Sequence, residues 1–172
     1  MSREFVVSYV PEKAICAEIG VWKGSFSEKI LERKPAKLFL IDPWKAMPEF
    51  GKADYGKLSQ EEMDEIFNGV RSRFKGNVEI IRKVSLDAVG DFRNNMLDFV
   101  YIDANYSYPF VLADLICWYH KVRKGGIISG DDYGIGGWWK GGVRKAVKHC
   151  LKILPLEKIE IKDNQFILRK SG

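Results

Sequence analysis

The segment Ala17-Glu-Ile-Gly-Val-Trp-Lys-Gly-Ser-Phe-Ser27 joins an apolar, strand-like pattern to a helical one. Gly20 and Gly24 stand where the chain must turn tightly or a ligand must approach the backbone, because glycine has no Cβ. Free N–H groups at the start of the following helix can bind a polar or anionic ligand group. The segment therefore predicts a strand–turn–helix unit with a ligand site at the turn.

The glycine spacing distinguishes between classes of ligand. The pattern Glu-x-Gly-x-x-x-Gly differs from the Gly-x-Gly-x-x-Gly of dinucleotide-binding proteins, which needs a third glycine. Glu18 at the mouth of the turn would repel a pyrophosphate and could accept a hydrogen bond from an ammonium group. The segment favours a cofactor that carries an amino acid over NAD, although a plain tight turn would need the same two glycines.

Outward from this segment, short apolar runs alternate with helical patterns, as in a mostly parallel sheet with helices on both faces. The last two runs alternate polar and apolar residues around Asp163-Asn164, which predicts a terminal antiparallel hairpin. We therefore expect an α/β fold with a seven-stranded, Rossmann-like, mostly parallel sheet and a C-terminal antiparallel hairpin. The expected strands are Ala14–Ile19, Lys37–Ile41, Val78–Ile81, Leu97–Ile102, Gly126–Ser129, Lys158–Lys162 and Phe166–Arg169.

Helices fit between these strands. Ser59-Gln-Glu-Glu62 is typical of a capping box that begins a helix. The Gly125-Gly126 pair is expected to end the helix Pro109–Val122. The other expected helices are Phe26–Arg33 and Gly141–Leu151.

Length and composition predict one globular domain over residues 1–172. The hydrophobic share of 46% and the charged share of 30% are close to globular averages. No apolar run approaches the ~20 residues of a membrane span, and residues 1–13 lack a secretory signal pattern. The three cysteines form no Cys-x-x-Cys pair, so we expect neither a metal nor a redox role for them. We expect a cytoplasmic protein without a membrane partner.

The net charge of +5 does not identify a partner. A basic balance would suit nucleic acid, but the lysines and arginines are spread along the chain. A solvated helix face explains the basic stretch from Lys140 to Lys152 as well as a phosphate track would.

A second motif lies at the end of the second expected strand. Asp42 follows the glycine segment by about twenty residues, where a carboxylate can bind both hydroxyls of a ribose. Trp44 offers a flat face for an adenine ring. The alternative is that Asp42 caps the turn before Pro43.

Five segments occur in a characteristic order: Glu18–Ser27, Ile41–Trp44, Val84–Asp87, Phe99–Tyr108 and Gly125–Tyr133. In this order and spacing they resemble the class I S-adenosylmethionine-dependent methyltransferases. More narrowly, they resemble the compact family that contains metal-dependent sugar O-methyltransferases. The resemblance implies S-adenosylmethionine as the cofactor. The implied cofactor-binding residues are Glu18, Gly20, Gly24, Ser25, Phe26, Ser27, Asp42, Trp44, Ser85, Leu86 and Asp103.

The resemblance also implies a metal site. Asp103, Asp131 and Asp132 are expected at the ends of two neighbouring strands, where they would repel one another unless a cation or an Arg or Lys partner intervenes. Their oxygens suit Mg²⁺ or another hard divalent cation. In metal-dependent relatives, carboxylates at these positions hold two adjacent substrate hydroxyls. The alternative is that they are strand-end aspartates that cap loops.

The catalytic candidates are Asp103, beside the reactive methyl group, and Tyr106. Relatives often have a histidine base at the position of Tyr106. A tyrosine with a pKa of ~10 is a poor base at neutral pH. Three explanations stay open: Tyr106 positions substrate, the base lies elsewhere, or the reaction differs from that of the family.

Two segments are candidates for the substrate side. Residues 45–60 could form a lid with Met47, Phe50 and Tyr55, or a flexible surface loop. Trp138 and Trp139, in a glycine-rich stretch, could stack on an acceptor or pin the last helix to the sheet.

These features predict methyl transfer to a hydroxyl of a small molecule, with metal assistance left open; a carboxyl or an amine is the alternative acceptor group. An inert cofactor-binding module and an RNA methyltransferase are the alternatives, and a NAD-dependent oxidoreductase fails on the glycine pattern. The Asn/Asp-Pro-Pro-Tyr/Phe motif of base amino-group methyltransferases is absent after the fourth strand. Nucleic acid is therefore not favoured as a partner, and a homodimer stays open.

Overall fold

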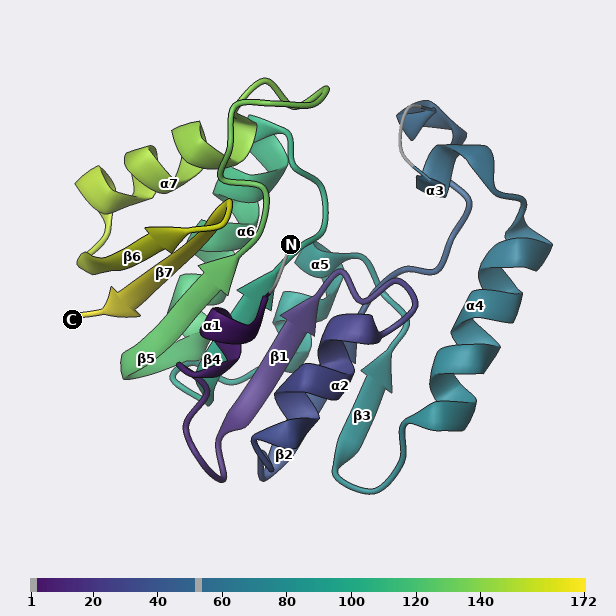
Figure 1. Ribbon diagram of the computed structural model, residues 1–172, viewed down its shortest axis with the longest axis horizontal. Helices are drawn as coiled ribbons and strands as arrows, with labels where there is room; N and C mark the ends of the chain where they lie inside the picture. Colours follow the sequence, from purple (N-terminus) through teal and green to yellow (C-terminus); the bar gives the residue numbers. More distant parts are fainter. Residues whose placement is uncertain (1–2, 52–53) are drawn as a thin grey trace.

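The computed structural model describes residues 3–51 and 54–172, and these form a seven-stranded sheet in the order β3-β2-β1-β4-β5-β7-β6 (Figure 1). The first five strands run parallel, and β7 lies antiparallel between β5 and β6. The predicted α/β class and terminal hairpin are therefore confirmed. The strands are β1 (Ile15–Ile19), β2 (Lys37–Ile41), β3 (Val78–Ile81), β4 (Leu97–Ile102), β5 (Val122–Gly130), β6 (Leu156–Lys162) and β7 (Gln165–Lys170).

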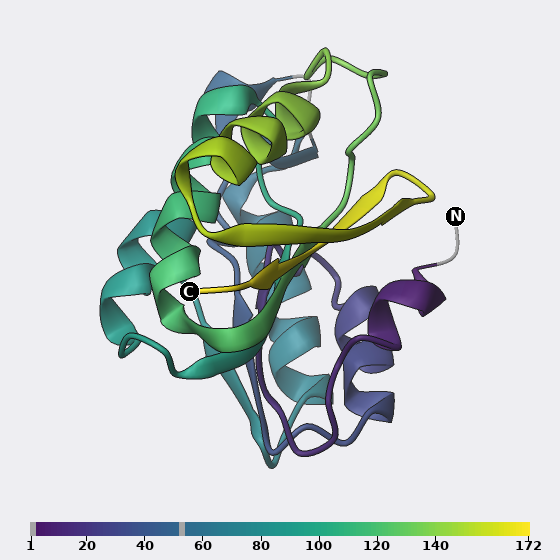
Figure 2. The same cartoon turned by 90° about the vertical axis from the view of Figure 1, so that its left-hand side faces the viewer.

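Helices cover both faces of the sheet, as Figure 2 shows with α1 and α2 on one side and α6 on the other. The first face carries α1 (Glu4–Val7), α2 (Ser25–Glu32) and α4 (Gln60–Arg73). The second face carries α5 (Ser85–Ala88), α6 (Tyr108–Lys121) and α7 (Gly142–Ile153). The short helix α3 (Asp54–Lys57) and the 3-10 turns η1 (Pro48–Phe50) and η2 (Val89–Asp91) complete the described elements. Within the described ranges, no helix has the length and apolar character of a membrane span.

The central strands have a hydrophobic core on each side. In β4, Phe99 and Tyr101 pack towards α1 and α2, whereas Val100 and Ile102 pack towards α6 and α7. Successive strand residues point to opposite faces, so a strand that is buried on both faces needs apolar residues throughout. This explains the continuous apolar run that identifies β4 in the sequence.

Two local predictions have different outcomes. The capping box is present: the Ser59 side chain accepts from the Glu62 N–H, and the Glu62 carboxylate accepts from the Ser59 N–H at 2.7 Å. The predicted helix stop at Gly125-Gly126 is wrong, because α6 ends at Lys121 and both glycines lie within β5. They fall where the β4–β5 register shifts, and a Cβ on Gly126 would lie 2.6 Å from Cγ1 of Val122. The two glycines therefore allow a bulge in β5 and do not end a helix.

A close backbone contact brings the carboxyl ends of β1, β2 and β4 together. The Asp103 N–H donates to the Ile19 carbonyl oxygen at 2.7 Å, and the Gly20 N–H donates to the Ile41 carbonyl oxygen at 2.9 Å. Gly20 has φ +88°, and a Cβ there would collide with the backbone oxygen of Asp103. Gly20 therefore fixes the edge of the sheet at which the site forms.

We expect Gly20→Ala to lower the free energy of unfolding by about 2–4 kcal/mol, because it adds backbone strain and a steric clash. Gly69→Ala is the matched control: Gly69 lies in α4 and a Cβ there meets nothing within 4 Å. That control should stabilise the protein by about 0.5–1 kcal/mol. Urea unfolding followed by circular dichroism measures both, and equal effects of the two variants would contradict the role of Gly20.

Candidate active site

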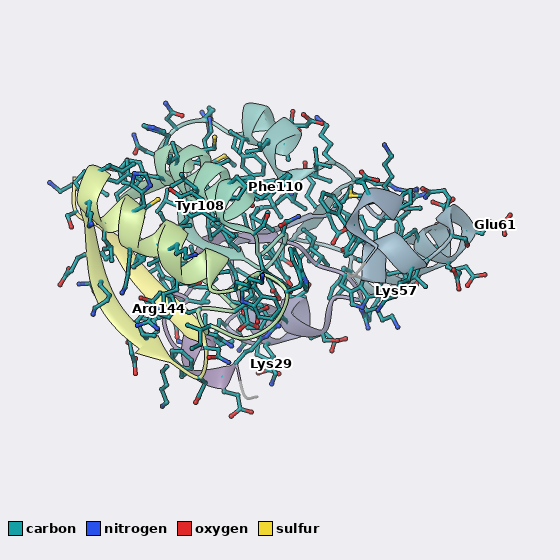
Figure 3. All side chains as sticks on the ribbon, turned by 90° about the horizontal axis from the view of Figure 1, so that it is seen from above. Lys29, Lys57, Glu61, Tyr108, Phe110 and Arg144 are labelled. Atoms are coloured by element: carbon teal, nitrogen blue, oxygen red, sulfur yellow. The ribbon has the colours of Figure 1, made fainter. Side chains whose placement is uncertain are left out.

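A cavity of about 870 Å³ opens at the carboxyl ends of β1, β2 and β4. This is where open α/β sheets bind ligands, and the volume falls within the range of small-molecule sites. Figure 3 views the molecule from this end. Lys29 of α2 and Phe110 of α6 both line the cavity, and they lie on opposite sides of the centre of the molecule. The cavity therefore extends across the end of the sheet, from the helices on one face to those on the other.

Most of the predicted cofactor residues line this cavity, and so does Tyr106. Those that line it are Glu18, Gly20, Ser25, Phe26, Asp42, Ser85, Leu86 and Asp103. The predicted site residues that are not part of its wall are Gly24, Ser27, Trp44, Asp131 and Asp132. Gly24 faces α4 instead, since a Cβ there would lie 2.6 Å from the Phe74 ring.

Glu18 is a buried carboxylate at the base of the cavity. Its side chain is 1% exposed, and the Ser27 hydroxyl donates to its Oε2 atom at 2.5 Å. Burial raises the pKa of Glu18 to about 8, although the hydrogen bond from Ser27 opposes the shift. Ser27 therefore affects the site by binding Glu18. A cationic group in the cavity would stabilise the ionised form of Glu18.

Asp42 holds the glycine segment in place. Its Oδ2 atom accepts from the N–H groups of Val21 and Trp22 at 3.0 and 2.9 Å, and its Oδ1 atom accepts from the Trp44 N–H at 2.8 Å. Burial raises the pKa of Asp42, and these hydrogen bonds oppose the rise. Asp42 thus caps the turn, which is the alternative role that the sequence left open, and it also lies in the cavity wall.

The lid segment closes onto the same carboxylate. The Tyr55 hydroxyl donates to Asp42 Oδ2 at 2.5 Å, and Met47, Phe50 and Tyr55 all line the cavity. Oδ2 of Asp42 thus receives three donors and Oδ1 receives one, and Tyr55 is the donor that comes from the lid segment. The predicted lid therefore forms a wall of the cavity; its residues 52 and 53 lie outside the described ranges.

Trp44 corrects the predicted adenine contact. Its side chain is 0% exposed, its indole N–H donates to the Trp22 carbonyl oxygen at 2.9 Å, and its ring packs 5.2 Å from that of Phe67. The bond between its backbone and Asp42 turns the chain so that the ring enters the core. The rings of Trp22 and Tyr55, 5.1 Å apart, line the cavity instead. The sequence analysis did not single out Trp22.

The adenine-edge candidates are anchored to α6. The Ser85 hydroxyl donates to Asp114 Oδ1 at 2.5 Å and accepts from the indole N–H of Trp118 at 2.9 Å. Leu86 is 46% exposed and lines the cavity. Ser85 therefore fixes this wall, and Leu86 supplies its apolar surface.

Arg3 bridges two of the three aspartates of the predicted metal site. Arg3 Nη1 lies 2.8 Å from Asp103 Oδ2, and Arg3 Nη2 lies 2.6 Å from Asp131 Oδ2. Asp131 also accepts from the N–H of Asp132 at 2.8 Å, which is the loop-capping alternative. In the part of the chain that the structure describes, no group of three potential ligands could hold a metal ion. Arg3, which no sequence motif indicates, supplies a cation to two of these carboxylates.

Asp103 and Tyr106 form the other polar pair in the cavity. The Tyr106 hydroxyl donates to Asp103 Oδ1 at 3.1 Å. Burial raises the pKa of Asp103 to about 7, and the Arg3 cation opposes the rise. Burial and the Asp103 carboxylate raise the pKa of Tyr106 above its ordinary value. Tyr106 thus stays protonated, which favours the explanation that it is a hydrogen-bond donor rather than a base.

The two tryptophans differ in exposure to the cavity. Trp138 is 38% exposed and lines the cavity, and its ring centroid lies 6.3 Å from that of Tyr106. Trp139 packs 5.2 Å from Tyr106 and joins the core beneath α7. Trp138 therefore fits the stacking role and Trp139 the pinning role.

Glu18 predicts a pH-dependent stability. Its pKa is near 4.5 in the unfolded chain and about 8 in the folded one, so the folded state binds the extra proton between these values. The free energy of unfolding therefore falls as pH rises from about 4.5 to 8. We expect Glu18→Gln, which keeps an acceptor for Ser27, to be more stable than the unchanged protein at pH 9, with a smaller difference at pH 5.

Urea unfolding at pH 5, 7 and 9 measures this difference. Glu61→Gln, at an exposed position in α4, is the control and should show no such trend. A Glu18→Gln variant that is less stable at pH 9 would show that the ionised carboxylate stabilises the fold.

A family model described as a methyltransferase domain matches residues 17–133. None of the curated proteins matches the sequence. Among solved structures, the O-methyltransferase NovP is 20% identical, with a TM-score of 0.64 over 98% of this chain and 76% of its own. Cofactor-bound Rv0187 from MTB is 12% identical, with a TM-score of 0.69 over 100% and 82%. An rRNA methylase from Streptococcus thermophilus is 11% identical, with a TM-score of 0.64 over 98% and 93%.

At these identities the structural similarities show the fold alone. The family match also shows which family the chain belongs to, because it spans more than half of the chain and includes the glycine segment, Asp42 and Asp103. S-adenosylmethionine is the cofactor of this family. The chain therefore belongs to the S-adenosylmethionine-dependent methyltransferases.

Proposed function

We propose that this methyltransferase transfers a methyl group to a hydroxyl oxygen of a small molecule. The observation that carries the proposal is the position of Asp103: its carboxylate lies at the end of β4 in the cavity wall, within reach of a bound acceptor, and burial raises its pKa to about 7. A group with this pKa can accept the proton of a hydroxyl at neutral pH. An O-methyltransferase needs such a group, because the acceptor oxygen must lose its proton.

The charges of the cavity fit the cofactor. S-adenosylmethionine supplies a methyl group on a positively charged sulfonium and carries an ammonium group. Glu18 is placed to accept from the ammonium, and Asp42 from the ribose hydroxyls. Leu86 offers apolar surface for the adenine. The carboxylates of Glu18, Asp42 and Asp103 all line the cavity and complement the positive charge of this ligand.

With the cofactor bound, the acceptor oxygen would form its bond to the methyl carbon as the bond from that carbon to the sulfonium breaks, which would leave a neutral thioether. Asp103 would accept the proton that the hydroxyl loses. Tyr106 donates to the other Asp103 oxygen and thereby orients the carboxylate. Positioning and proton acceptance by a single carboxylate are the contributions we assign to the protein.

The walls of the cavity support a small acceptor with an apolar or ring-shaped face. Phe50 of the lid segment and Phe110 of α6 meet edge to face, 5.9 Å apart, and Trp138 lies beyond Tyr106. Aromatic faces stack well on sugars and on aromatic rings. The lid and the Trp138 loop enclose the acceptor end, which suits a small molecule better than a polymer.

The proposal is tested by calorimetry and by methyl transfer to a panel of hydroxyl compounds. We expect micromolar binding of S-adenosylmethionine and of its demethylated product, and none of NAD. Glu18→Gln should weaken binding at least about tenfold, since an ion-assisted hydrogen bond is lost, whereas Glu61→Gln should not. Asp103→Asn should lower kcat at least about 100-fold. Transfer to RNA with a steep salt dependence, and to no hydroxyl compound, would contradict the proposal.

Tyr55 yields a second test of the cofactor site. Its hydroxyl is a side-chain donor to Asp42, unlike the three backbone N–H groups, and it would compete with a ribose hydroxyl for Oδ2. We therefore expect Tyr55→Phe, which keeps the ring of the lid and frees the carboxylate, to bind S-adenosylmethionine about threefold to tenfold more tightly. Calorimetry measures the change, with Tyr9→Phe as the control because Tyr9 bonds Glu160 instead. Weaker binding would mean that Tyr55 contributes a bond to the bound cofactor.

A further inference from the structure

Arg3 forms ion pairs with two aspartates that follow the ends of strands, at one end of the cavity. One guanidinium nitrogen binds Asp103 after β4, and the other binds Asp131 after β5, at 2.8 and 2.6 Å. Arg3 itself lines the cavity. A single planar cation therefore spans the two strand ends and faces the ligand space.

The guanidinium is held in place by more than its charge. Its central carbon lies 5.6 Å from the ring centroid of Phe26 and 5.7 Å from that of Tyr101. These distances suit cation–π contacts. The helix α1 that follows Arg3 is anchored by Val6 and Val7, which are buried in the core beside α2. The fold thus presents the cation at a defined position.

We propose that Arg3 is a resident cation that takes the place of a divalent metal ion, so that the acceptor end of this methyltransferase works without metal. A hard divalent cation would need the oxygens of Asp103 and Asp131 that now bind the guanidinium. Two cations cannot share these oxygens without strong repulsion. The absence of a three-ligand group among the described residues agrees with this assignment.

The assignment gives Arg3 a role in the proposed reaction. A fixed positive charge beside the reacting oxygen stabilises the negative charge that develops there. Guanidinium has five N–H donors, so the two ion pairs leave others that can face the cavity. This role rests on the proposed function, whereas the exclusion of metal rests only on the geometry of the ion pairs.

Titration with Mn²⁺, followed by electron paramagnetic resonance and calorimetry, tests the exclusion directly. The unchanged protein should show no saturable Mn²⁺ site. Arg3→Gln, which leaves the carboxylates without their cation, should bind Mn²⁺ at least about tenfold more tightly. Adding Asp131→Asn to Arg3→Gln should remove the gain. Arg71→Gln, at an exposed position in α4, is the control and should behave like the unchanged protein.

Two results would overturn the proposal. One is saturable, micromolar Mn²⁺ binding by the unchanged protein, which would mean that the metal displaces Arg3. The other is equally weak Mn²⁺ binding by the unchanged protein and by folded Arg3→Gln. Circular dichroism checks folding; if Arg3→Gln does not fold, Arg3→Lys, which keeps the charge, must also exclude Mn²⁺, and binding by it would overturn the proposal.

Activity provides a separate readout. Methyl transfer by the unchanged protein should be unaffected by a chelator, and added Mg²⁺ should not raise it. A protein that excludes Mn²⁺ but methylates no hydroxyl compound would contradict the proposed function and leave the role of Arg3 as a metal substitute intact. A protein that methylates hydroxyl compounds only with added metal would overturn the role of Arg3 alone.

Discussion

The buried carboxylate of Asp42 joins three segments on which the site depends. It binds two amides of the glycine segment, the backbone of Trp44 and the hydroxyl of Tyr55 in the lid. A buried carboxylate is costly unless it is hydrogen-bonded, and each of its two oxygens accepts at least one of these bonds. Because the same contacts set the path of the chain into α2, the position of the cofactor site follows from how one charge is compensated.

Three acidic side chains line the cavity and favour a positively charged ligand. Burial raises the pKa of Glu18, Asp42 and Asp103 together. A fold selected for stability alone would avoid three such groups in one cavity. A positively charged ligand would lower the free-energy cost of ionising these carboxylates. The same burial that destabilises the carboxylates without a ligand therefore favours the binding of a cationic cofactor. Arg3 relieves part of this penalty at the acceptor end.

The sequence predicts the features that arise from local patterns. The bounds of β2, β3 and β4 agree with the prediction. Apolar runs mark β2 and β4, which are buried on both faces, whereas β3 lies at the edge of the sheet and is only partly buried. The glycine segment and Asp42 also lie at the cavity, since strand ends meet at one edge of a parallel sheet. Periodicity could not place Trp44, whose direction goes with a positive φ, a backbone bond to Asp42 and an indole bond to Trp22. It could not find Arg3 either, because the partners of Arg3 lie far along the chain.

Arg3 and Tyr106 together explain how the acceptor end differs from that of the metal-dependent relatives it resembles. A metal ion lowers the pKa of a bound hydroxyl, so that a weak base is enough to deprotonate it. In the mechanism we propose, Arg3 takes the place of the metal and tyrosine that of histidine, so the proton passes to a carboxylate. Asp103 suits this role, because burial raises its pKa to about 7 while Arg3 and Tyr106 bind its two oxygens. The proposal therefore links the two departures from the family pattern, because both leave Asp103 to accept the proton.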